Sequence, residues 1–113
     1  MSHYLDLDLI DQLKLTMAEQ FHRLIITFLK EMDHISQHLY QSIQESDHQN
    51  VYYWTHMMKG AASTIGAKQL ANSCGKLEHL AKENASKNNL KKQYKQITSD
   101  QSHTSSALHK LLS

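Results

Sequence analysis

Proline is absent from this sequence of 113 residues, and only three glycines occur, all between residues 60 and 75. Proline breaks the interior of a helix and glycine weakens it by about 1 kcal/mol relative to alanine, so their scarcity predicts long helices with short joints. The single cysteine, Cys74, excludes an internal disulfide. Its spacing from Leu70, Leu77 and Ala81 places it on the buried face of a helix, so we do not expect a reactive thiol.

Long hydrophobic runs are also missing, because no apolar stretch approaches the ~20 residues that a membrane-spanning helix requires. The first residues lack the basic start and apolar stretch of a secretory signal. A chain of 113 residues with 40% hydrophobic content is long enough for one core and too short for two. We therefore expect a single cytoplasmic domain over residues 1–113, without membrane contact.

Apolar residues recur at intervals of three and four along most of the chain, which is the spacing of one helix face. The pattern is clearest from Phe21 to Ile43, over about six turns. The expected helices cover about residues 8–15, 21–43, 47–65 and 67–83, with a last one starting near Ser86. Ser46 or Asp47 can cap the third, and Gly66 permits the turn after it. The fold class predicted is all-α, an up-down-up-down antiparallel four-helix bundle with a short additional N-terminal helix over one end.

Two features fit this pattern poorly. The polar residues Gln101 and Thr104 interrupt the apolar stripe of the last helix, so we expect that segment to fray. Gly75 lies in the exposed middle of the fourth helix, where glycine is locally unfavourable, and the sequence offers no firm reason for it.

The third helix carries a histidine opposite its apolar side. At about 100° per residue, Trp54, Met58, Ala61 and Ile65 share one side, and His56 points away from them. An exposed imidazole can attack a phosphoryl group through a ring nitrogen.

The neighbours of His56 on the helix suit such chemistry. Lys59 lies one turn further on and can neutralise a transferred phosphoryl group. Gly60 and Ser63 fall within about 40° of the histidine on the helical wheel. The bare backbone of Gly60 leaves space for the phosphoryl group or a docking protein, and Ser63 can add a hydrogen bond or simply let a partner approach.

The charges of the chain are divided unevenly. Residues 1–50 hold eight acids and three bases, a charge of −5, and residues 51–113 hold three acids and nine lysines, a charge of +6. The lysines are spread along helices with little aromatic interleaving and without a base-reading motif, which argues against nucleic-acid binding. An acidic pocket on a protein partner fits better.

The residues around His56 occur in a recognisable order: His56, Lys59-Gly60, Ala61-Ala62-Ser63, Gly66-Ala67, Leu70, Cys74 and Leu77-Glu78. This order resembles the signature of the histidine-containing phosphotransfer (HPt) domain, and the resemblance covers most of the chain, the final helix least. Thr55 and the pair Met57-Met58 depart from the usual pattern, which bears on the choice of partner.

The resemblance implies that His56 is phosphorylated by a receiver-domain aspartate and passes the group to another receiver, with Lys59 and Gly60 assisting. It implies a phosphocarrier whose partners are response-regulator receiver domains and a hybrid sensor histidine kinase. We expect a monomer, because a bundle that covers its own apolar stripes has no need to dimerise. No metal or cofactor is expected in this chain, because the receiver brings its own Mg²⁺. Nothing resembles a nucleotide-binding loop, so ATP-dependent kinase activity is not expected.

The partner-binding residues expected around the histidine are Tyr52, Tyr53, Ser63 and Lys68, with Lys82 as a second candidate for steering an acidic partner. The two tyrosines flank the face of His56, and they can equally belong to the edge of the core.

Two other functions are compatible with the sequence. The chain can be a helical adaptor that binds receivers or kinases without turnover of phosphohistidine. Nine histidines also suggest metal binding, and His34 and His38 have the i, i+4 spacing of zinc ligands, although no third ligand is evident nearby.

Overall fold

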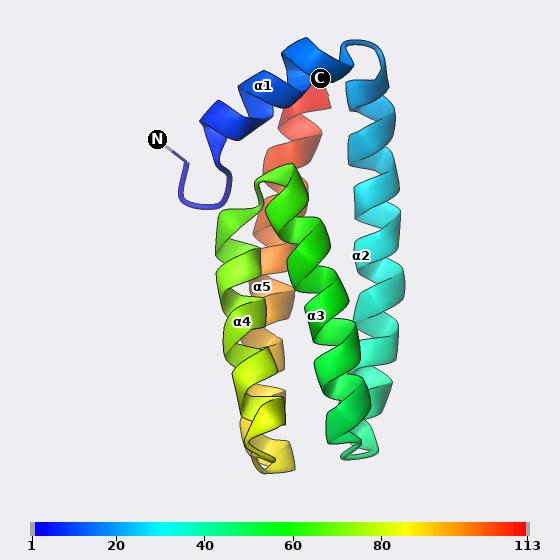
Figure 1. The fold of residues 1–113 in the computed structure, drawn as a ribbon, viewed down its shortest axis with the longest axis vertical. Coiled ribbons are helices and arrows are strands. Elements are labelled where there is room, and N and C mark those ends of the chain that lie inside the picture. Colours follow the sequence, from blue (N-terminus) through cyan, green and yellow to red (C-terminus); the bar gives the residue numbers. More distant parts are fainter. Residues whose placement is uncertain (1, 113) are drawn as a thin grey trace.

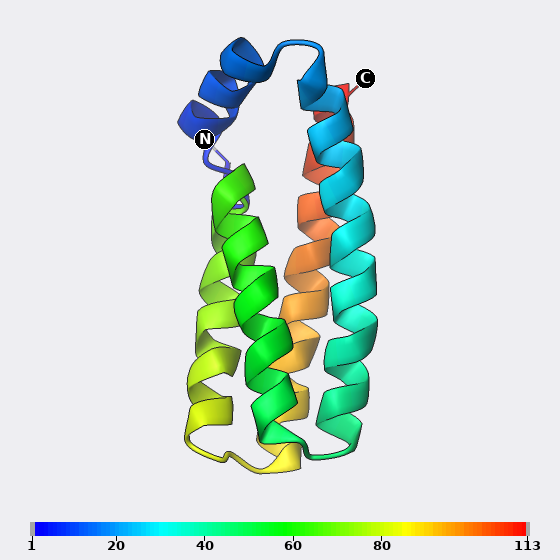
Figure 2. The same ribbon diagram turned by 45° about the vertical axis from the view of Figure 1, so that its right-hand side comes forward.

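The computed structural model describes residues 2–112, which form helices and no strands. The five helices are α1 (Leu7–Met17), α2 (Gln20–Gln44), α3 (His48–Ile65), α4 (Lys68–Lys82) and α5 (Lys87–Leu112). Helices α2 to α5 run alternately up and down, and α1 lies across the end where α3 joins α4 (Figure 1). In the turned view, α5 lies between α4 and α2, so the chain closes a four-helix bundle (Figure 2). The predicted fold class is confirmed.

The helix ends follow the expected local chemistry. Asp47, not Ser46, caps α3, because its side chain accepts a hydrogen bond from the Asn50 N–H. Gly66 ends α3 with φ of 81°, a left-handed conformation that favours glycine. The Ser86 hydroxyl accepts a hydrogen bond from the Asn89 N–H and caps the start of α5.

Helix α1 closes one end of the core. Ile10 is buried there, and Leu13 packs against the buried cluster. The Asp6 N–H donates a 2.7 Å hydrogen bond to the Gly66 carbonyl, which ties the start of α1 to the α3–α4 turn. Cys74 lies inside the bundle, where burial above all raises the pKa of its thiol to about 12.

The expectation that α5 frays was wrong, because α5 is continuous to Leu112 and its polar residues are paired. Thr104 is buried and donates to the Asp100 carbonyl. The Asp100 carboxylate is buried as well and accepts hydrogen bonds from Ser73 on α4 and from Gln96. Buried polar groups are tolerated when they have partners, so the interrupted stripe still packs.

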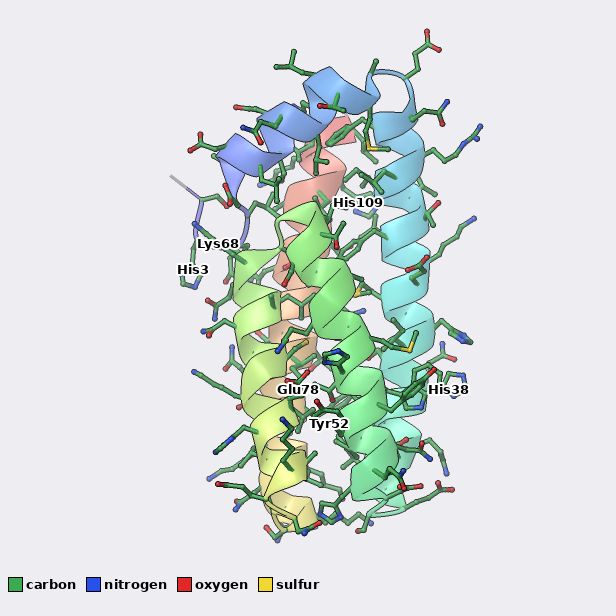
Figure 3. The ribbon with its side chains drawn as sticks, viewed as in Figure 1. His3, His38, Tyr52, Lys68, Glu78 and His109 are labelled. Atoms are coloured by element: carbon green, nitrogen blue, oxygen red, sulfur yellow. The ribbon has the colours of Figure 1, made fainter. Side chains whose placement is uncertain are left out.

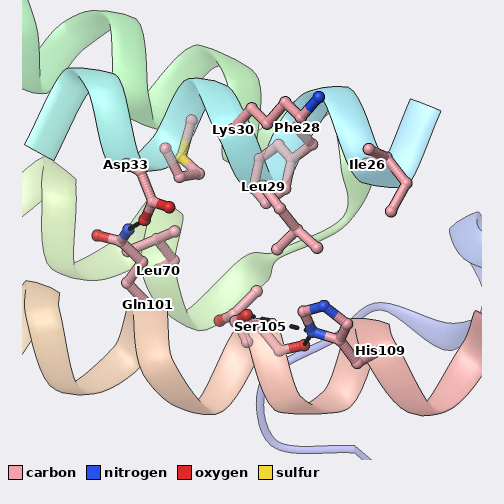
Figure 4. A pocket seen from close by; sticks show the side chains of 11 residues that line it. Ile26, Phe28, Leu29, Lys30, Asp33, Leu70, Gln101, Ser105 and His109 are labelled. Atoms are coloured by element: carbon pink, nitrogen blue, oxygen red, sulfur yellow. Dashed lines mark hydrogen bonds between the residues drawn. The ribbon is translucent and has the colours of Figure 1, made fainter. Parts of the chain in front are cut away.

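A cavity of about 290 Å³ lies between α2 and α5 (Figure 4). Leu29 and Ile26 contribute to its apolar wall, and His109 lies at its α5 side. Gln101 also lines it and donates a long hydrogen bond of 3.4 Å to Asp33. Within residues 2–112, Gln101 Oε1 is the buried side-chain polar atom without a hydrogen-bond partner. Over the same residues, no helix is long and apolar enough to span a membrane.

Candidate phosphotransfer site

Helix α3 buries one face and presents His56 on the other. Thr55 and Met58 are fully buried, whereas the side chain of His56 is 63% exposed. The centre of the buried face differs slightly from the prediction, because Trp54 is only partly buried. Thr55 takes its place in the core, where its hydroxyl donates a 2.6 Å hydrogen bond to the Val51 carbonyl. An unpaired buried hydroxyl is costly, and this bond removes the cost.

The His56 ring is held by a carboxylate from the neighbouring helix. Nδ1 of His56 lies 2.7 Å from Oε2 of Glu78 on α4. Oε1 of the same carboxylate accepts a 3.0 Å hydrogen bond from the Lys59 ammonium group. Glu78 therefore joins the two residues that the sequence singled out, and its own side chain is only 11% exposed.

The charge state of Glu78 follows from these contacts. Burial alone would raise the pKa of its carboxyl, but the hydrogen bonds from Lys59 and His56 outweigh burial and lower the pKa below its ordinary 4.5. An ionised carboxylate only accepts hydrogen bonds, so Nδ1 of His56 must carry the proton. Nε2 is then the nitrogen with the free lone pair, and within residues 2–112 it has no hydrogen-bond partner.

Tyr52 adds a second constraint on the imidazole. Its ring is nearly parallel to that of His56, with an interplanar angle of 10° and centroids 5.8 Å apart. The Lys82 ammonium group lies 5.2 Å from the centroid of Tyr52. Tyr52 and Glu78 lie close together between α3 and α4, in the half of the bundle farther from α1 (Figure 3). The site therefore combines a held imidazole with Lys59 and Lys82 at its side.

The other predicted partner residues lie at different distances from this site. Tyr53 precedes His56 on α3 and is 52% exposed, and Ser63 is exposed two turns further on. An added Cβ at Gly60 would meet nothing within 4 Å, so the packing of this chain does not require glycine there. Lys68 is not part of the site. It begins α4, about 15 Å along the helix from Glu78 at ~1.5 Å per residue, toward the end covered by α1 (Figure 3).

Among residues 2–112, no group of three or more His, Cys, Asp or Glu side chains is placed to hold a metal ion. His34 and His38 instead form an aromatic cluster with Trp54. The His38 ring stacks on Trp54 at 4.4 Å, and His34 packs edge-on against both.

Glu78 is the site residue that the sequence reasoning did not assign a role. The prediction quoted it only as part of the motif, next to the buried Leu77. The sequence did contain one signal, a carboxylate beside the apolar stripe of α4. Charged residues are seldom buried unless they are paired, so a carboxylate at this position indicates a partner for its charge. Its partners, 22 and 19 residues away in sequence, appear only in the fold.

The sequence model of the Hpt domain matches residues 23–112, which include α3, α4, α5 and nearly all of α2. The chain belongs to the Hpt domain family. Hpt proteins carry phosphoryl groups in two-component signalling, and the matched residues include the His56 site described above.

Two solved structures share the fold of this Hpt protein. The crystal structure of histidine-containing phosphotransfer protein B (HptB) from Pseudomonas aeruginosa PAO1 has a TM-score of 0.92 and 22% identity, covering 97% of this chain and 95% of that chain. The X-ray structure of a candidate histidine-containing phosphotransfer protein from rice has a TM-score of 0.88 and 14% identity, covering 97% and 80%. No curated protein sequence matches this Hpt chain.

Proposed function

We propose that this Hpt protein accepts a phosphoryl group on Nε2 of His56 from a receiver-domain aspartate and passes it to the aspartate of another receiver. The observation that carries the proposal is the pairing of His56 with Glu78. Nδ1 is occupied by the 2.7 Å contact to the carboxylate, which leaves Nε2 free on an exposed side chain.

The proposed transfer step conserves atoms and charge. The Nε2 lone pair of His56 attacks the phosphorus of the aspartyl phosphate, the bond from phosphorus to the aspartyl oxygen breaks, and the aspartate leaves as a carboxylate. The ring gains positive charge, which the ionised Glu78 stabilises through Nδ1–H. The receiver supplies Mg²⁺, and the reverse step returns the phosphoryl group to a second aspartate.

Lys59 has two anionic partners available in this scheme. In the unphosphorylated protein its ammonium group binds Glu78 at 3.0 Å. A phosphoryl group on His56, one turn earlier on α3, offers the same flexible cation a second anion. Substituting Lys59 by alanine should lower the transfer rate, because the arriving charge loses its neighbouring cation.

Partner binding is proposed to involve the exposed surface around His56. Tyr53 and Met57 are 52% and 41% exposed on either side of it in sequence, and large exposed apolar side chains often mark interaction sites. Ser63 and the open backbone of Gly60 allow a partner to approach closely. Lys82 is better placed than Lys68 to steer an acidic receiver, because it lies beside Tyr52 in the site.

The test is phosphotransfer from several phosphorylated receiver domains to the wild-type protein and to His56→Gln. We expect an acid-labile, alkali-stable label on the wild type and none on the variant. Docking by both proteins without label on either would overturn the proposal in favour of an adaptor that binds without phosphate turnover. ATP alone, without a kinase, should leave the protein unlabelled.

A further inference from the structure

Gly75 lies in the middle of α4, and the packing of the chain does not account for it. An added Cβ there would have only one neighbour within 4 Å, Cδ of Lys59, at the ordinary contact distance of 4.0 Å. Glycine in a helix interior costs about 1 kcal/mol relative to alanine. The packing of the core therefore does not require glycine at this position.

A hollow of about 660 Å³ lies over Gly75 and crosses the outer surface of α4, because it is lined by Lys59 from α3 and Gln93 from α5 as well as by α4. A second hollow of about 610 Å³ lies between α4 and α5 and shares Lys76, Leu80 and Gln93 with the first. We call the two together the α4 groove. Its lining residues are Lys59, Gln69, Ala71, Asn72, Ser73, Gly75, Lys76, His79, Leu80, Asn89, Lys92, Gln93 and Gln96.

The lining of the α4 groove contains three lysines and no carboxylate. Residues 51–113 have only three acids, and each is already paired. Glu78 binds His56 and Lys59, Glu83 pairs with His79 at 3.2 Å, and Asp100 is buried against Ser73. Within residues 2–112, Lys76 and Lys92 form no salt bridge. These two lysines therefore give the groove uncompensated positive charge, whereas the charge of Lys59 is paired with Glu78.

We propose that the α4 groove binds an extended acidic segment of a partner protein. Lys76 and Lys92 lie on neighbouring helices, α4 and α5, so their charges suit several carboxylates along a chain better than a single small anion. Asn72 and Asn89 can donate hydrogen bonds to carboxylates and backbone carbonyls. No Phe, Tyr or Trp side chain lines the groove, and its one imidazole, that of His79, is paired with Glu83, so the groove offers little surface on which nucleic-acid bases could stack.

The α4 groove lies close to His56. Lys59, which lines one end of it, lies one turn from His56 and shares the Glu78 carboxylate with it. A protein whose acidic segment occupied the α4 groove would be held beside the exposed imidazole. The binding itself does not depend on the proposed phosphotransfer, because His56 does not line the groove.

The first experiment is titration of the isotope-labelled protein with a short oligoglutamate peptide at low ionic strength, followed by NMR, with oligoglutamine as the neutral control. We expect shift changes at the groove residues of α4 and α5. The double variant Lys76→Ala, Lys92→Ala should bind the peptide roughly tenfold more weakly. The matched control is Lys91→Ala, Lys95→Ala, which removes the same charge from exposed positions of α5 outside the groove and should change the affinity less than about twofold.

The variant Gly75→Gln tests whether a loss of peptide binding comes from blocking the groove or from misfolding. Glutamine is a far better helix former than glycine, so the midpoint of thermal unfolding should rise. The same side chain would occupy the point where the groove crosses α4, so peptide binding should weaken at least about threefold through a steric block. A variant that is more stable and binds less cannot be explained by misfolding.

Several results would overturn the proposal. If both lysine double variants bound the peptide equally weakly, peptide binding would depend only on the net charge of the protein. Inorganic phosphate or a short single-stranded oligonucleotide that bound more tightly than the peptide would assign the groove to another ligand. His56→Gln should bind the peptide like the wild type, so a failure of phosphotransfer and a failure of the groove give different results.

Discussion

Nδ1 of His56 and Oε2 of Glu78 lie 2.7 Å apart, although the two residues are 22 positions apart in sequence and on different helices. The same carboxylate binds Lys59, so one side chain orients the imidazole and holds the nearest cation. This relationship determines which ring nitrogen is free to react.

Glu78→Gln should slow phosphotransfer at saturating receiver by about fivefold, because a charge-assisted hydrogen bond is ~1 kcal/mol stronger than a neutral one. The measurement is the single-turnover rate of label transfer. Glu83→Gln is the matched control, since Glu83 pairs with His79 on the exposed surface at the end of the same helix. Equal rates for wild type and Glu78→Gln would contradict the orienting role.

Gly60→Ala should stabilise the protein and impair transfer together. The added Cβ meets nothing within 4 Å, so the helix gains up to about 1 kcal/mol and the midpoint of thermal unfolding rises by a few degrees. Transfer from a receiver should fall, because the methyl group occupies the surface a partner approaches. Labelling by a small donor such as phosphoramidate should be affected less, and unchanged transfer from a receiver would argue against docking at Gly60.

Replacing both Tyr53 and Met57 by serine should raise KM for the receiver by at least about fivefold, because truncation of central apolar contacts commonly costs more than 1 kcal/mol. The control is the pair Leu15→Ser and Tyr40→Ser, which removes two equally large exposed side chains, 85% and 49% exposed, from α1 and α2. Labelling by phosphoramidate should stay constant in the wild type and in both double variants. A rise in KM for the control pair alone would place the docking surface elsewhere.

The contribution of Glu78 to stability should depend on pH. Hydrogen bonds from Lys59 and His56 outweigh burial and lower the pKa of Glu78 in the folded protein below 4.5. Its contribution is therefore fully present above about pH 4.5 and is lost as the pH falls through the folded pKa. Urea unfolding of wild type and Glu78→Gln should differ most above this pH and converge below it. A difference in unfolding free energy that stayed constant across this pH range would show that the ionised form of Glu78 does not stabilise the protein.

Gln101→Met should raise the free energy of unfolding by about 1 kcal/mol, because it removes a buried acceptor that has no partner and fills the cavity between α2 and α5 with an apolar side chain. Gln96→Met should have the opposite effect, since Gln96 donates a 3.0 Å hydrogen bond to the buried Asp100 carboxylate. The midpoints of urea denaturation test both predictions, because the midpoint should rise for Gln101→Met and fall for Gln96→Met. Destabilisation by Gln101→Met would indicate that its 3.4 Å hydrogen bond to Asp33 matters more than the unpaired oxygen.

The sequence by itself determined the all-α bundle, the start of α3 at Ser46 or Asp47, its end at Gly66, and the exposure of His56. These depend on local periodicity and capping, which short stretches of sequence encode. The Hpt signature also identified His56, Lys59 and Gly60, because they lie within one helix. The prediction for α5 was wrong for a related reason, since periodicity counts Thr104 as polar and cannot register the hydrogen bond that lets it be buried.

Only the tertiary structure decided the rest. Glu78 reaches His56, and Ser73 reaches Asp100, across the interfaces of α4 with its two neighbouring helices, and the register of packed helices is set by how their side chains interdigitate. The same packing places Lys82 beside Tyr52 and leaves Lys68 about three turns of α4 from Glu78. It also gathers Lys59, Lys76 and Lys92 from three helices along one groove. Whether two helices are in contact depends on how far apart they lie in space, and this distance cannot be read from their separation along the chain.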